Sequence, residues 1–452
     1  MSEPHVVILG AGFGGLSAAK ALARAPVRVT VVDQSNHHLF QPLLYQVATA
    51  ALTAPDIAAP IRGLLADQAN CTVLMAQASR IDVASRAVTL DQGELRYDAL
   101  VVATGMTHAY FGHDEWAKDA PGLKTLQEAL DIRARVLRAY EAAERESDHE
   151  RQRELLTFVV IGAGPTGVEM AGALAEIATR TLARDFRRFD PARDVRVVLI
   201  EGGDRVLPAM DPESSSTAQK ALRALGVEVR LRSRVTALDA RGVSIGGERI
   251  EAATIVWAAG LRASPLTADL GCELDRAGRV RVTDELGVPG HPEVFVIGDL
   301  IGKEQDGKPL PGVAQLAMQS GRYAARAIES RLLGYPVAPF RYADKGSMAT
   351  IGRARAVAEV FGSRFGGVVA WVLWLFIHIL FLVDFRNRIA VLMEWAYAYV
   401  TWRRSARVIL DAPGRHRPAH ERQSILRAAL SEPPQEPARS VSPEAPSEAR
   451  EP

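Results

Sequence analysis

The stretch VVILGAGFGG, residues 6–15, begins as an apolar run and ends in a glycine-rich turn. Its first four residues are β-branched or leucine, as is typical of a buried strand in a parallel sheet. Residues 16–25, rich in alanine and leucine, are expected to form the helix that follows. A strand, a glycine turn and a helix in this order predict an α/β domain with a parallel sheet and covering helices.

Three glycines of the turn, Gly10, Gly12 and Gly15, have the spacing GxGxxG. Gly10 permits the tight turn, Gly12 lets the backbone approach a pyrophosphate, and Gly15 allows close helix–strand packing. The helix N-terminus adds free N–H groups and the positive end of its dipole. Asp33 ends the next predicted strand, where a carboxylate can accept from a ribose 2′-hydroxyl. We therefore expect a bound dinucleotide, with a merely tight turn as the alternative.

The same pattern returns after a second apolar run, in Gly162, Gly164 and Gly167. Glu201 ends the strand that follows, although it lies farther on than the usual ~20 residues. We attribute the excess to an inserted helical stretch at residues 180–194. The architecture of the first part of the chain is therefore expected to repeat.

Two such turns predict two nucleotides held face to face, the arrangement that hydride transfer between nicotinamide and flavin requires. Glu201 favours NADH, because a carboxylate hydrogen-bonds a free 2′-hydroxyl and repels a 2′-phosphate. The nearby Arg205 is the main feature that favours NADPH. The N-terminal turn is then expected to hold FAD.

Two later turns agree with a flavin site. Ala103, Thr104 and Gly105 follow one predicted strand, and Gly298 and Asp299 follow another. In these features the chain resembles the FAD/NAD-linked reductase superfamily, and the resemblance implies that the aspartate contacts the ribityl-phosphate portion of the flavin. The expected fold is α/β, with two doubly wound Rossmann-like dinucleotide-binding domains and a C-terminal helical region that associates with a membrane.

The composition is that of a multidomain globular protein. A length of 452 residues suggests about three units of about 150 residues. The formal charge of +1 gives no general attraction to nucleic acid. Cys71 and Cys272 are far apart and are predicted to be inert core thiols, so neither a redox pair nor a metal site is expected. The N-terminus shows no cleavable signal, which predicts a protein that remains in the cytoplasm.

Without a cysteine pair, electrons are expected to leave the flavin for an organic acceptor that docks on it. A closer likeness lies in residues 12–16, 41–45, 164–169, 314–319 and 344–349. In these segments the chain closely resembles the type II NADH:quinone oxidoreductases, which are single-subunit, non-pumping respiratory NADH dehydrogenases. The resemblance implies FAD and NADH as cofactors, a membrane quinone as acceptor and a homodimer.

The quinone signature of that family, AQxAxQ, is matched by Ala314, Gln315, Ala317 and Gln319. On a helix the two glutamines lie at i and i+4 on one face, and the alanines leave room for a flat ring. Their amides can hydrogen-bond quinone carbonyls, and the quinone is expected to enter near them and near Gln41, beside the FAD. An amphipathic helix with two surface amides is the alternative.

Four further residues lie close to these motifs. The resemblance implies that Glu169, near the flavin–nicotinamide junction, is a nicotinamide-side or proton-handling carboxylate; a helix-capping acid is the alternative. Lys345 is expected to set charge near the reduced flavin or the quinone, unless it is an exposed salt-bridging lysine. His37 and His38 are interpreted as solvated loop residues.

Two apolar stretches, residues 368–383 and 389–402, predict two helices in tandem. The first is shorter than the ~20 residues that a membrane-crossing helix needs, although two preceding glycines can extend it. We expect both helices to lie on the cytoplasmic face of the cell membrane, with a dimer interface as the alternative. Aromatic and basic residues are expected at the level of the lipid headgroups: Trp374, Arg386, Arg388, Trp395 and Trp402.

The expected domains are discontinuous. They are an FAD-binding domain (residues 1–121 and 266–335), an NADH-binding domain (122–265), a C-terminal β piece with membrane-associating helices (336–410) and a disordered tail (411–452). The sequence does not predict a proton channel, because a channel needs several membrane-spanning helices with buried ionisable residues. Two other functions stay open: a ferredoxin- or rubredoxin-reductase-like enzyme with a protein acceptor, and a membrane-attached NADH redox sensor.

Overall fold

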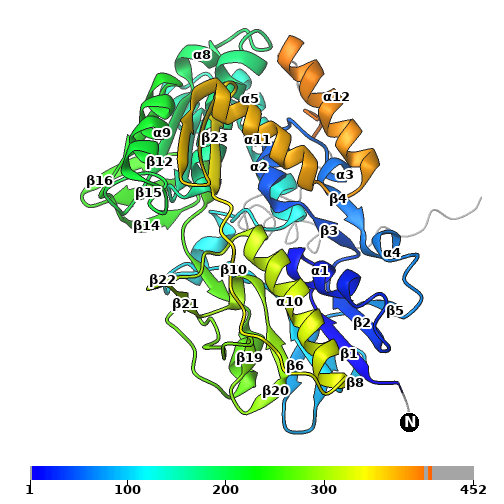
Figure 1. The fold of residues 1–452 in the computed structure, drawn as a ribbon. Helices are drawn as coiled ribbons and strands as arrows, with labels where there is room; N and C mark the ends of the chain where they lie inside the picture. The colour runs from blue at the N-terminus through cyan, green and yellow to red at the C-terminus, as the bar shows by residue number, and fades with distance from the viewer. Residues whose placement is uncertain (1–2, 402–405, 410–452) are drawn as a thin grey trace, which may run out of the picture. The chain divides into compact units, whose positions relative to one another are not determined.

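The computed structural model describes residues 3–401 and 406–409 (Figure 1). The predicted disordered tail, residues 411–452, and Trp402 lie outside the described residues.

The first sheet has six strands in the order β19-β20-β9-β1-β2-β5. All neighbouring strands are parallel except β19 and β20, which pair antiparallel. The strands are β1 (His5–Leu9), β2 (Arg28–Asp33), β5 (Cys71–Met75), β9 (Ala99–Val102), β19 (Gly287–Val288) and β20 (His291–Val296). The expected run of residues 6–9 is therefore an inner strand, with β2 and β9 on either side.

The two faces of this sheet are covered differently. Val6 and Ile8 of β1 pack toward helices α1 (Phe13–Ala21) and α10 (Ala314–Leu332), which lie side by side (Figure 1). Val7 and Leu9 pack toward the antiparallel sheet of β6 (Ala78–Asp82), β7 (Ala87–Leu90) and β8 (Gly93–Arg96). The expectation of helices on both faces is wrong here. Short strands with large apolar side chains, such as Ile81 and Val88, bury that face instead.

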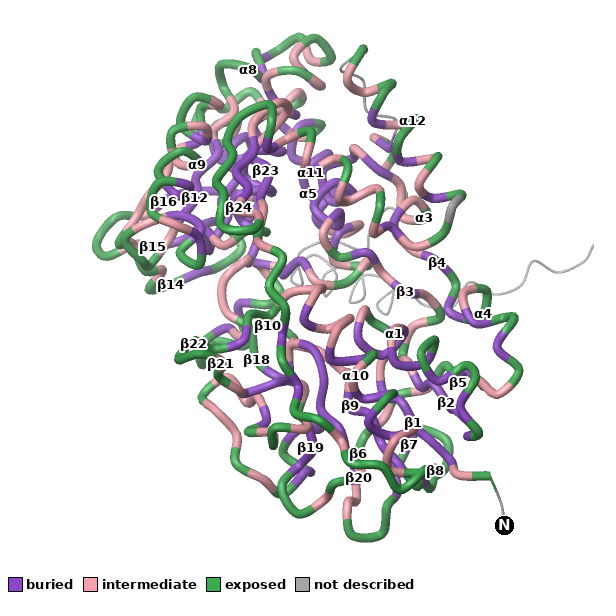
Figure 2. Tube along the Cα trace, in the orientation of Figure 1, coloured by how far each residue is buried: buried purple, intermediate pink, exposed green. Residues whose placement is uncertain are grey.

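The second sheet repeats this plan with four parallel strands in the order β13-β12-β11-β17. Helices cover one face, and the antiparallel sheet β14-β15-β16 packs on the other. The elements are β11 (Thr157–Ile161), β12 (Arg196–Ile200), β13 (Val227–Arg230), β14 (Val235–Asp239), β15 (Gly242–Ile245), β16 (Glu248–Glu251), β17 (Thr254–Trp257), α5 (Leu126–Arg145), α6 (His149–Leu155), α7 (Pro165–Glu176) and α9 (Pro212–Ala224). The central strands of both sheets are buried (Figure 2).

The inserted stretch before β12 is only partly helical. It contains a π-helix at Ile177–Thr181 and the short helix α8 (Pro191–Asp194), and the segment between them has no regular structure. Backbone N–H groups of Arg187 and Arg188 donate to the carboxylate of Glu144 on α5. The expected helical stretch at residues 180–194 is therefore only partly helical in the described segment.

The chain passes between the two sheets along β10 (Met106–His108) and β18 (Leu261–Ala263), which pair antiparallel. Near the flavin-side sheet lie the short elements β3 (His37–Leu39), α2 (Leu44–Ala48), α3 (Ala54–Ile57), β4 (Ala58–Pro60) and α4 (Ile61–Leu64). The predicted core thiols are only partly buried: Cys71 and Cys272 are both of intermediate exposure, so this prediction is wrong. Partial burial still raises the pKa of Cys71 to about 11.

A small antiparallel sheet leads to the two apolar helices predicted near the end of the chain. It consists of β23 (Ser347–Gly352), β24 (Arg355–Val360) and β25 (Ser363–Gly366), and β23 packs on α7. The helices follow as α11 (Gly367–Phe381) and α12 (Phe385–Thr401). Within the described part of the chain, no helix is both long and apolar enough to cross a lipid bilayer.

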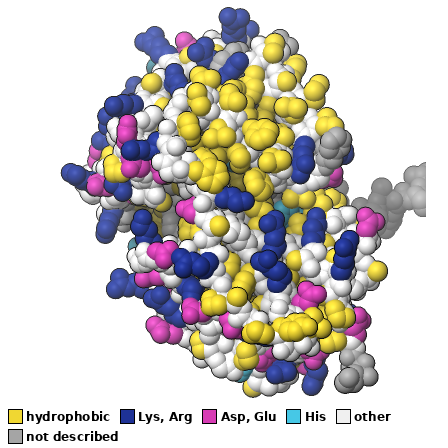
Figure 3. Space-filling model, in the orientation of Figure 1, with side chains coloured by type: hydrophobic (Ala, Val, Ile, Leu, Met, Phe, Trp, Pro, Cys, Tyr) yellow, Lys and Arg dark blue, Asp and Glu magenta, His cyan; other side chains and the backbone are white. Residues whose placement is uncertain are grey.

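The two helices α11 and α12 expose many apolar side chains on their outer side. Their outer side chains gather in an exposed patch that we call the apolar face (Figure 3), made of Val368, Val369, Val372, Phe376, Leu380, Ile389, Leu392, Met393, Tyr397 and Val400. Trp374 and Trp395 point inward and are only 1% and 4% exposed. The expectation that these two tryptophans lie at headgroup level is therefore wrong, because both fill the core beneath the helices.

Candidate dinucleotide and acceptor sites

The first glycine turn leaves space where a phosphate would need it. Gly12 forms the N-terminal end of α1, and a Cβ atom there would meet nothing within 4 Å. A Cβ at Gly15 would lie 1.8 Å from the carbonyl oxygen of Gly10, so helix and strand can approach only with glycine at this position. The second turn repeats both features, with Gly164 open and a Cβ at Gly167 placed 1.8 Å from the carbonyl oxygen of Gly162.

An acid supports each turn through the same pair of hydrogen bonds. Asp33 accepts from the backbone N–H of Ala11 in the turn and from that of Ser35, both at 2.7 Å. Glu201 accepts from the backbone N–H of Ala163 and from that of Gly203, again both at 2.7 Å. The insertion before β12 thus leaves Glu201 at the strand end. Each carboxylate oxygen retains a lone pair that a ribose hydroxyl can use.

Arg205 lies in the loop that follows Glu201. One of its terminal nitrogens donates to the carbonyl of Pro208 at 3.1 Å, and its buried Nε has no partner among the described residues. Arg205 is thus partly committed to its own loop.

Buried polar atoms without partners surround the first turn. Thr104 Oγ1, His38 Nε2 and Gln315 Oε1 are buried and accept or donate no hydrogen bond among the described residues. Buried polar groups are rarely left unpaired, so these atoms fit a polar ligand such as FAD. Gly298 and Asp299 open a 3₁₀ helix after β20, and burial raises the pKa of Asp299. Gly12, Asp33, Thr104 and Asp299 all lie at or just after the carboxyl ends of the neighbouring parallel strands β1, β2, β9 and β20. FAD would thus meet them along one edge of the sheet.

The interpretation of His38 as a solvated loop residue is wrong. His38 lies on β3, is 2% exposed, and its Nδ1 is 2.9 Å from the carbonyl oxygen of Ala11. Its ring packs edge-on against Phe13 of the glycine turn, and burial lowers its pKa. Successive residues of a strand point to opposite faces, so His38 is buried while its neighbours His37 and Leu39 are partly exposed. This alternation in a short strand was the sequence signal that could have predicted the burial of His38.

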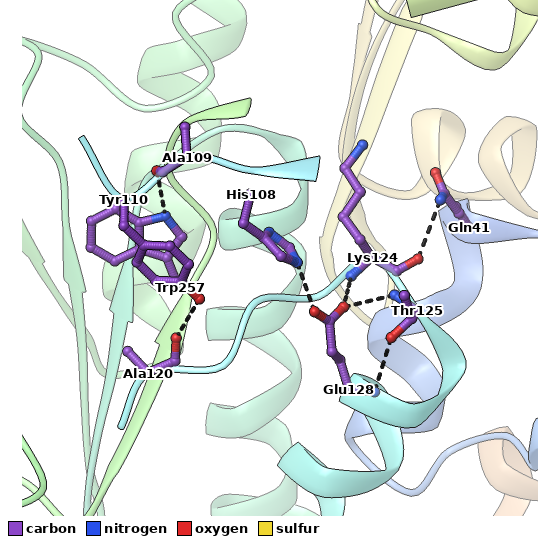
Figure 4. Close-up of polar contacts among 9 residues, drawn as sticks. All are labelled: Gln41, His108, Ala109, Tyr110, Ala120, Lys124, Thr125, Glu128 and Trp257. Atoms are coloured by element: carbon purple, nitrogen blue, oxygen red, sulfur yellow. Dashed lines mark hydrogen bonds and ion pairs between the residues drawn. The ribbon is translucent and has the colours of Figure 1, made fainter. Parts of the chain in front are cut away.

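Lys124 and Glu128 are further residues that the sequence motifs did not reveal. The Gln41 side chain donates to the backbone carbonyl of Lys124 at 3.2 Å, while Glu128 accepts from the backbone N–H of Lys124 and from His108 Nε2 (Figure 4). Glu128 also closes a capping box with Thr125 at the start of α5. These hydrogen bonds lower the pKa of Glu128 to about 2 despite the opposing effect of burial.

The two glutamines of the AQxAxQ motif both face the segment that precedes β23. Gln315 Nε2 lies 3.4 Å from the carbonyl oxygen of Gly346. Gln319 is bonded twice to Ala343, donating to its carbonyl at 2.9 Å and accepting from its N–H at 3.0 Å. Gln315 thus keeps a free carbonyl oxygen, whereas Gln319 holds the backbone. Lys345 is exposed between these contacts and forms no ion pair within the described chain.

Glu169 lies in the wall of a second space, beneath the C-terminal helices. It is buried in the second turn of α7, which excludes a capping role, and burial raises its pKa to about 8. The cavity is lined by side chains of α2, α7, β23, α11 and α12, among them Tyr45, Gln46, Thr350, Trp374, Trp395 and Tyr399. An acid that stays protonated at neutral pH thus faces a cavity whose lining combines aromatic side chains with polar ones.

The two sheets, the repeated turns and the C-terminal helices have counterparts in known proteins. Residues 4–321 match the family "Pyridine nucleotide-disulphide oxidoreductase", and residues 345–404 match "NDH2 C-terminal domain". The solved structure of NDH2 from Plasmodium falciparum with NADH superposes with a TM-score of 0.82 at 18% identity, covering 91% of this chain and 100% of that one. This likeness concerns the fold.

Sequence relatives are closer. The type II NADH:quinone oxidoreductase NdhA of Mycobacterium tuberculosis is 48% identical over 414 residues, covering 88% of this chain and 87% of the relative. The enzyme Ndh of the same organism is 44% identical over 423 residues, covering 90% of both chains. With an α/β fold of parallel Rossmann-like sheets, two glycine turns and this degree of identity, the chain belongs to the family of type II NADH:quinone oxidoreductases.

Proposed function

We propose that this protein is a peripheral membrane flavoenzyme that oxidises NADH and reduces a membrane quinone without pumping protons. The observation that carries the proposal is the repetition of one site: two glycine turns, each braced by an acid through the same two backbone hydrogen bonds. FAD bound at one turn would supply a ring that accepts a hydride from NADH and passes two electrons on to quinone.

The residues of this chain would bind and orient the reactants. We assign them to FAD (Gly10, Gly12, Gly15, Asp33, Gln41, Ala103, Thr104, Gly105, Gly298 and Asp299) and to NADH (Gly162, Gly164, Gly167 and Glu201). The assignment implies an FAD-binding domain of residues 1–121 and 266–335 and an NADH-binding domain of residues 122–265. Strict positioning of the two rings would account for most of the rate.

On the quinone side, the amide of Gln315 and the protonated Glu169 are the groups best suited to act. The second N–H of the Gln315 amide can donate to a quinone carbonyl, and its free Oε1 can accept from the hydroxyl of the reduced quinol. Gln315 would orient the quinone through its amide, and Gln319 would act by holding the segment around Ala343. Lys345, exposed beside Gly346, would supply positive charge. Glu169 would hold a proton in the cavity beneath α11 and α12, where quinone reduction consumes protons.

The apolar face of α11 and α12 supports attachment to the cytoplasmic surface of a membrane, where residues 336–410 would bring the acceptor site to the lipid. Exposed apolar patches of this kind mark interaction surfaces. Lipid is favoured over a protein acceptor because the same helices wall the cavity on their inner side, which gives a lipid-soluble acceptor a short path. We propose a homodimer as well, as the family resemblance implies.

Separate measurement of the two half-reactions tests the function. The purified yellow protein should be bleached by NADH and reoxidised by a short-chain quinone. Truncation of Gln315 to alanine should slow reoxidation by quinone and leave bleaching by NADH unchanged. Bleaching without reoxidation by any quinone would instead indicate a redox sensor or a reductase with a protein acceptor.

A further inference from the structure

Lys124 lies where the chain crosses from the first sheet to the second. The segment before it pairs with the end of β17, since Gly122 bridges to Trp257 and Trp257 N–H donates to Pro121. Gly122 also packs against the ring of His108 so closely that any Cβ atom would lie about 2.1 Å from it. The backbone around Lys124 therefore has little freedom.

Three hydrogen bonds hold this stretch of backbone in place, two of them made by Lys124 itself. Its N–H and that of Thr125 donate to Glu128 Oε2 at 2.8 Å, and its carbonyl accepts from Gln41 at 3.2 Å. The side chain runs away from this network (Figure 4). The backbone at Lys124 is therefore held in place, and the ammonium points away from the hydrogen bonds that hold it.

The ammonium of Lys124 has no partner there. Among the described residues it forms no hydrogen bond and no ion pair within 4 Å, and partial burial lowers its pKa. The carboxylates of Asp299 and Glu128 are the charges that act on it, and Glu128 is already bonded to His108. A partly desolvated cation without a partner is costly unless a ligand supplies negative charge.

The position of Lys124 indicates which part of a ligand it meets. Its backbone is bonded to Gln41, which we expect beside FAD where the quinone enters, and its ammonium is attracted by Asp299, which we expect at the ribityl end of the flavin. The turn that cradles a pyrophosphate is braced by another acid, Asp33. The segment also lies between the two nucleotide sites, where flavin and nicotinamide rings must meet. On the basis of the proposed function, we infer that the Lys124 ammonium lies beside the flavin ring of FAD and stabilises the negative charge that the ring gains on reduction.

The ammonium of Lys124 would change the reduction potential of the flavin, because the flavin ring gains negative charge when it is reduced. A flavin that accepts a hydride from NADH gains two electrons and one proton, so the reduced ring carries one more negative charge than the oxidised ring, and NAD⁺ is released. A fixed cation nearby favours the reduced form and raises the reduction potential. One hydrogen bond to a charged group corresponds to about a 10- to 100-fold change in the equilibrium constant.

The test compares Lys124→Met with Lys124→Arg in the full-length, FAD-loaded protein. The midpoint potential, measured by equilibration with a reference dye, should fall in the methionine variant by about 30 to 60 mV, which is 10- to 100-fold for a two-electron couple. The arginine variant should recover most of the loss. Lys220→Met, an exposed lysine of α9, serves as the matched control and should leave the potential unchanged.

A second measurement does not depend on turnover. Sulfite adds to the oxidised flavin ring to form an anionic adduct that bleaches the yellow band, and a nearby cation strengthens its binding. Sulfite affinity should fall at least tenfold in Lys124→Met and not in Lys220→Met. An unchanged potential and sulfite affinity would overturn the inference, as would an equal loss of affinity for oxidised and reduced FAD, which indicates a phosphate contact. Neither measurement uses quinone. If the quinone were the wrong acceptor, both shifts would still be seen in Lys124→Met, and the error would appear only as a reduced flavin that no quinone reoxidises.

Discussion

The indole Nε1 of Trp395 donates a hydrogen bond to the side-chain oxygen of Gln46 at 2.8 Å, joining helix α12 to helix α2 across 349 positions of the chain. Gln46 in turn donates to the hydroxyl of the neighbouring Tyr45 at 2.9 Å. Both residues follow Gln41, and both line the cavity that contains Glu169. The C-terminal helices are therefore bonded directly to the segment that we assign to the flavin site.

Loss of this hydrogen bond should affect the acceptor side of the enzyme. In Trp395→Phe the ring stays apolar and large, but Gln46 Oε1 is left buried without its donor, at a cost of about 1–3 kcal/mol in unfolding free energy. The KM for quinone should rise while the rate of flavin reduction by NADH stays unchanged. Stopped-flow reduction and steady-state quinone titration measure the two effects. Tyr397→Phe, on the exposed side of α12, is the control, and an equal change in both variants would contradict the prediction.

Exchange of Glu201 for glutamine should weaken NADH without removing FAD. The amide keeps one acceptor oxygen, but its NH₂ group faces a backbone N–H at either Ala163 or Gly203. With one charged hydrogen bond lost, at about 1.5–3 kcal/mol, the KM for NADH should rise about 10- to 100-fold. The preference for NADH over NADPH should also decrease, because the variant no longer has the carboxylate that repels a 2′-phosphate.

The matched variant at the first turn is Asp33→Asn, which alters the same pair of bonds beside the other nucleotide. It should lower the FAD content of the purified protein and leave the ratio of NADH to NADPH activity unchanged. The assignment of the two turns would be reversed if Glu201→Gln lost flavin and Asp33→Asn changed nicotinamide preference.

The pKa of Glu169 predicts a pH dependence of stability. Burial raises this pKa from 4.5 to about 8, so between these values the folded protein keeps a proton that the unfolded chain has released. Stability contributed by this group should therefore fall as pH rises from about 4.5 to 8, and stay level above. Glu169→Gln should remove this part of the slope. Melting temperatures of both proteins across pH 5–9 measure it; parallel curves would show that Glu169 ionises freely.

Much of the site followed from local sequence, and the reason is physical. Each glycine turn and its acid, Asp33 or Glu201, lie on neighbouring strands joined by one helical connection. The turn and the strand end therefore carry the geometry, even where an insertion lengthens the spacing, as it does before Glu201. His38, Lys124 and Trp374 depend on contacts between distant segments. No periodicity indicates that Lys124 is bonded to Gln41, or that Trp374 turns inward while Phe376 stays exposed. The three-stranded sheets were missed for the same reason. Their strands are short, and the face of the parallel sheet on which they pack exists only after distant parts of the chain have come together.

The apolar face yields a prediction that separates lipid binding from dimerisation. Phe376 is 64% exposed at the centre of α11, and transfer of such a ring from water is worth about 1.5–3 kcal/mol. Phe376→Glu should therefore lower partitioning onto anionic lipid vesicles by about 10-fold or more, while sedimentation velocity reports an unchanged oligomeric state. Tyr335→Glu, equally exposed but in the turn after α10, should bind vesicles as the unaltered protein does. A shift of Phe376→Glu to monomers with vesicle binding intact would assign this face to a subunit interface, because a surface buried in a dimer has no contact with lipid to lose.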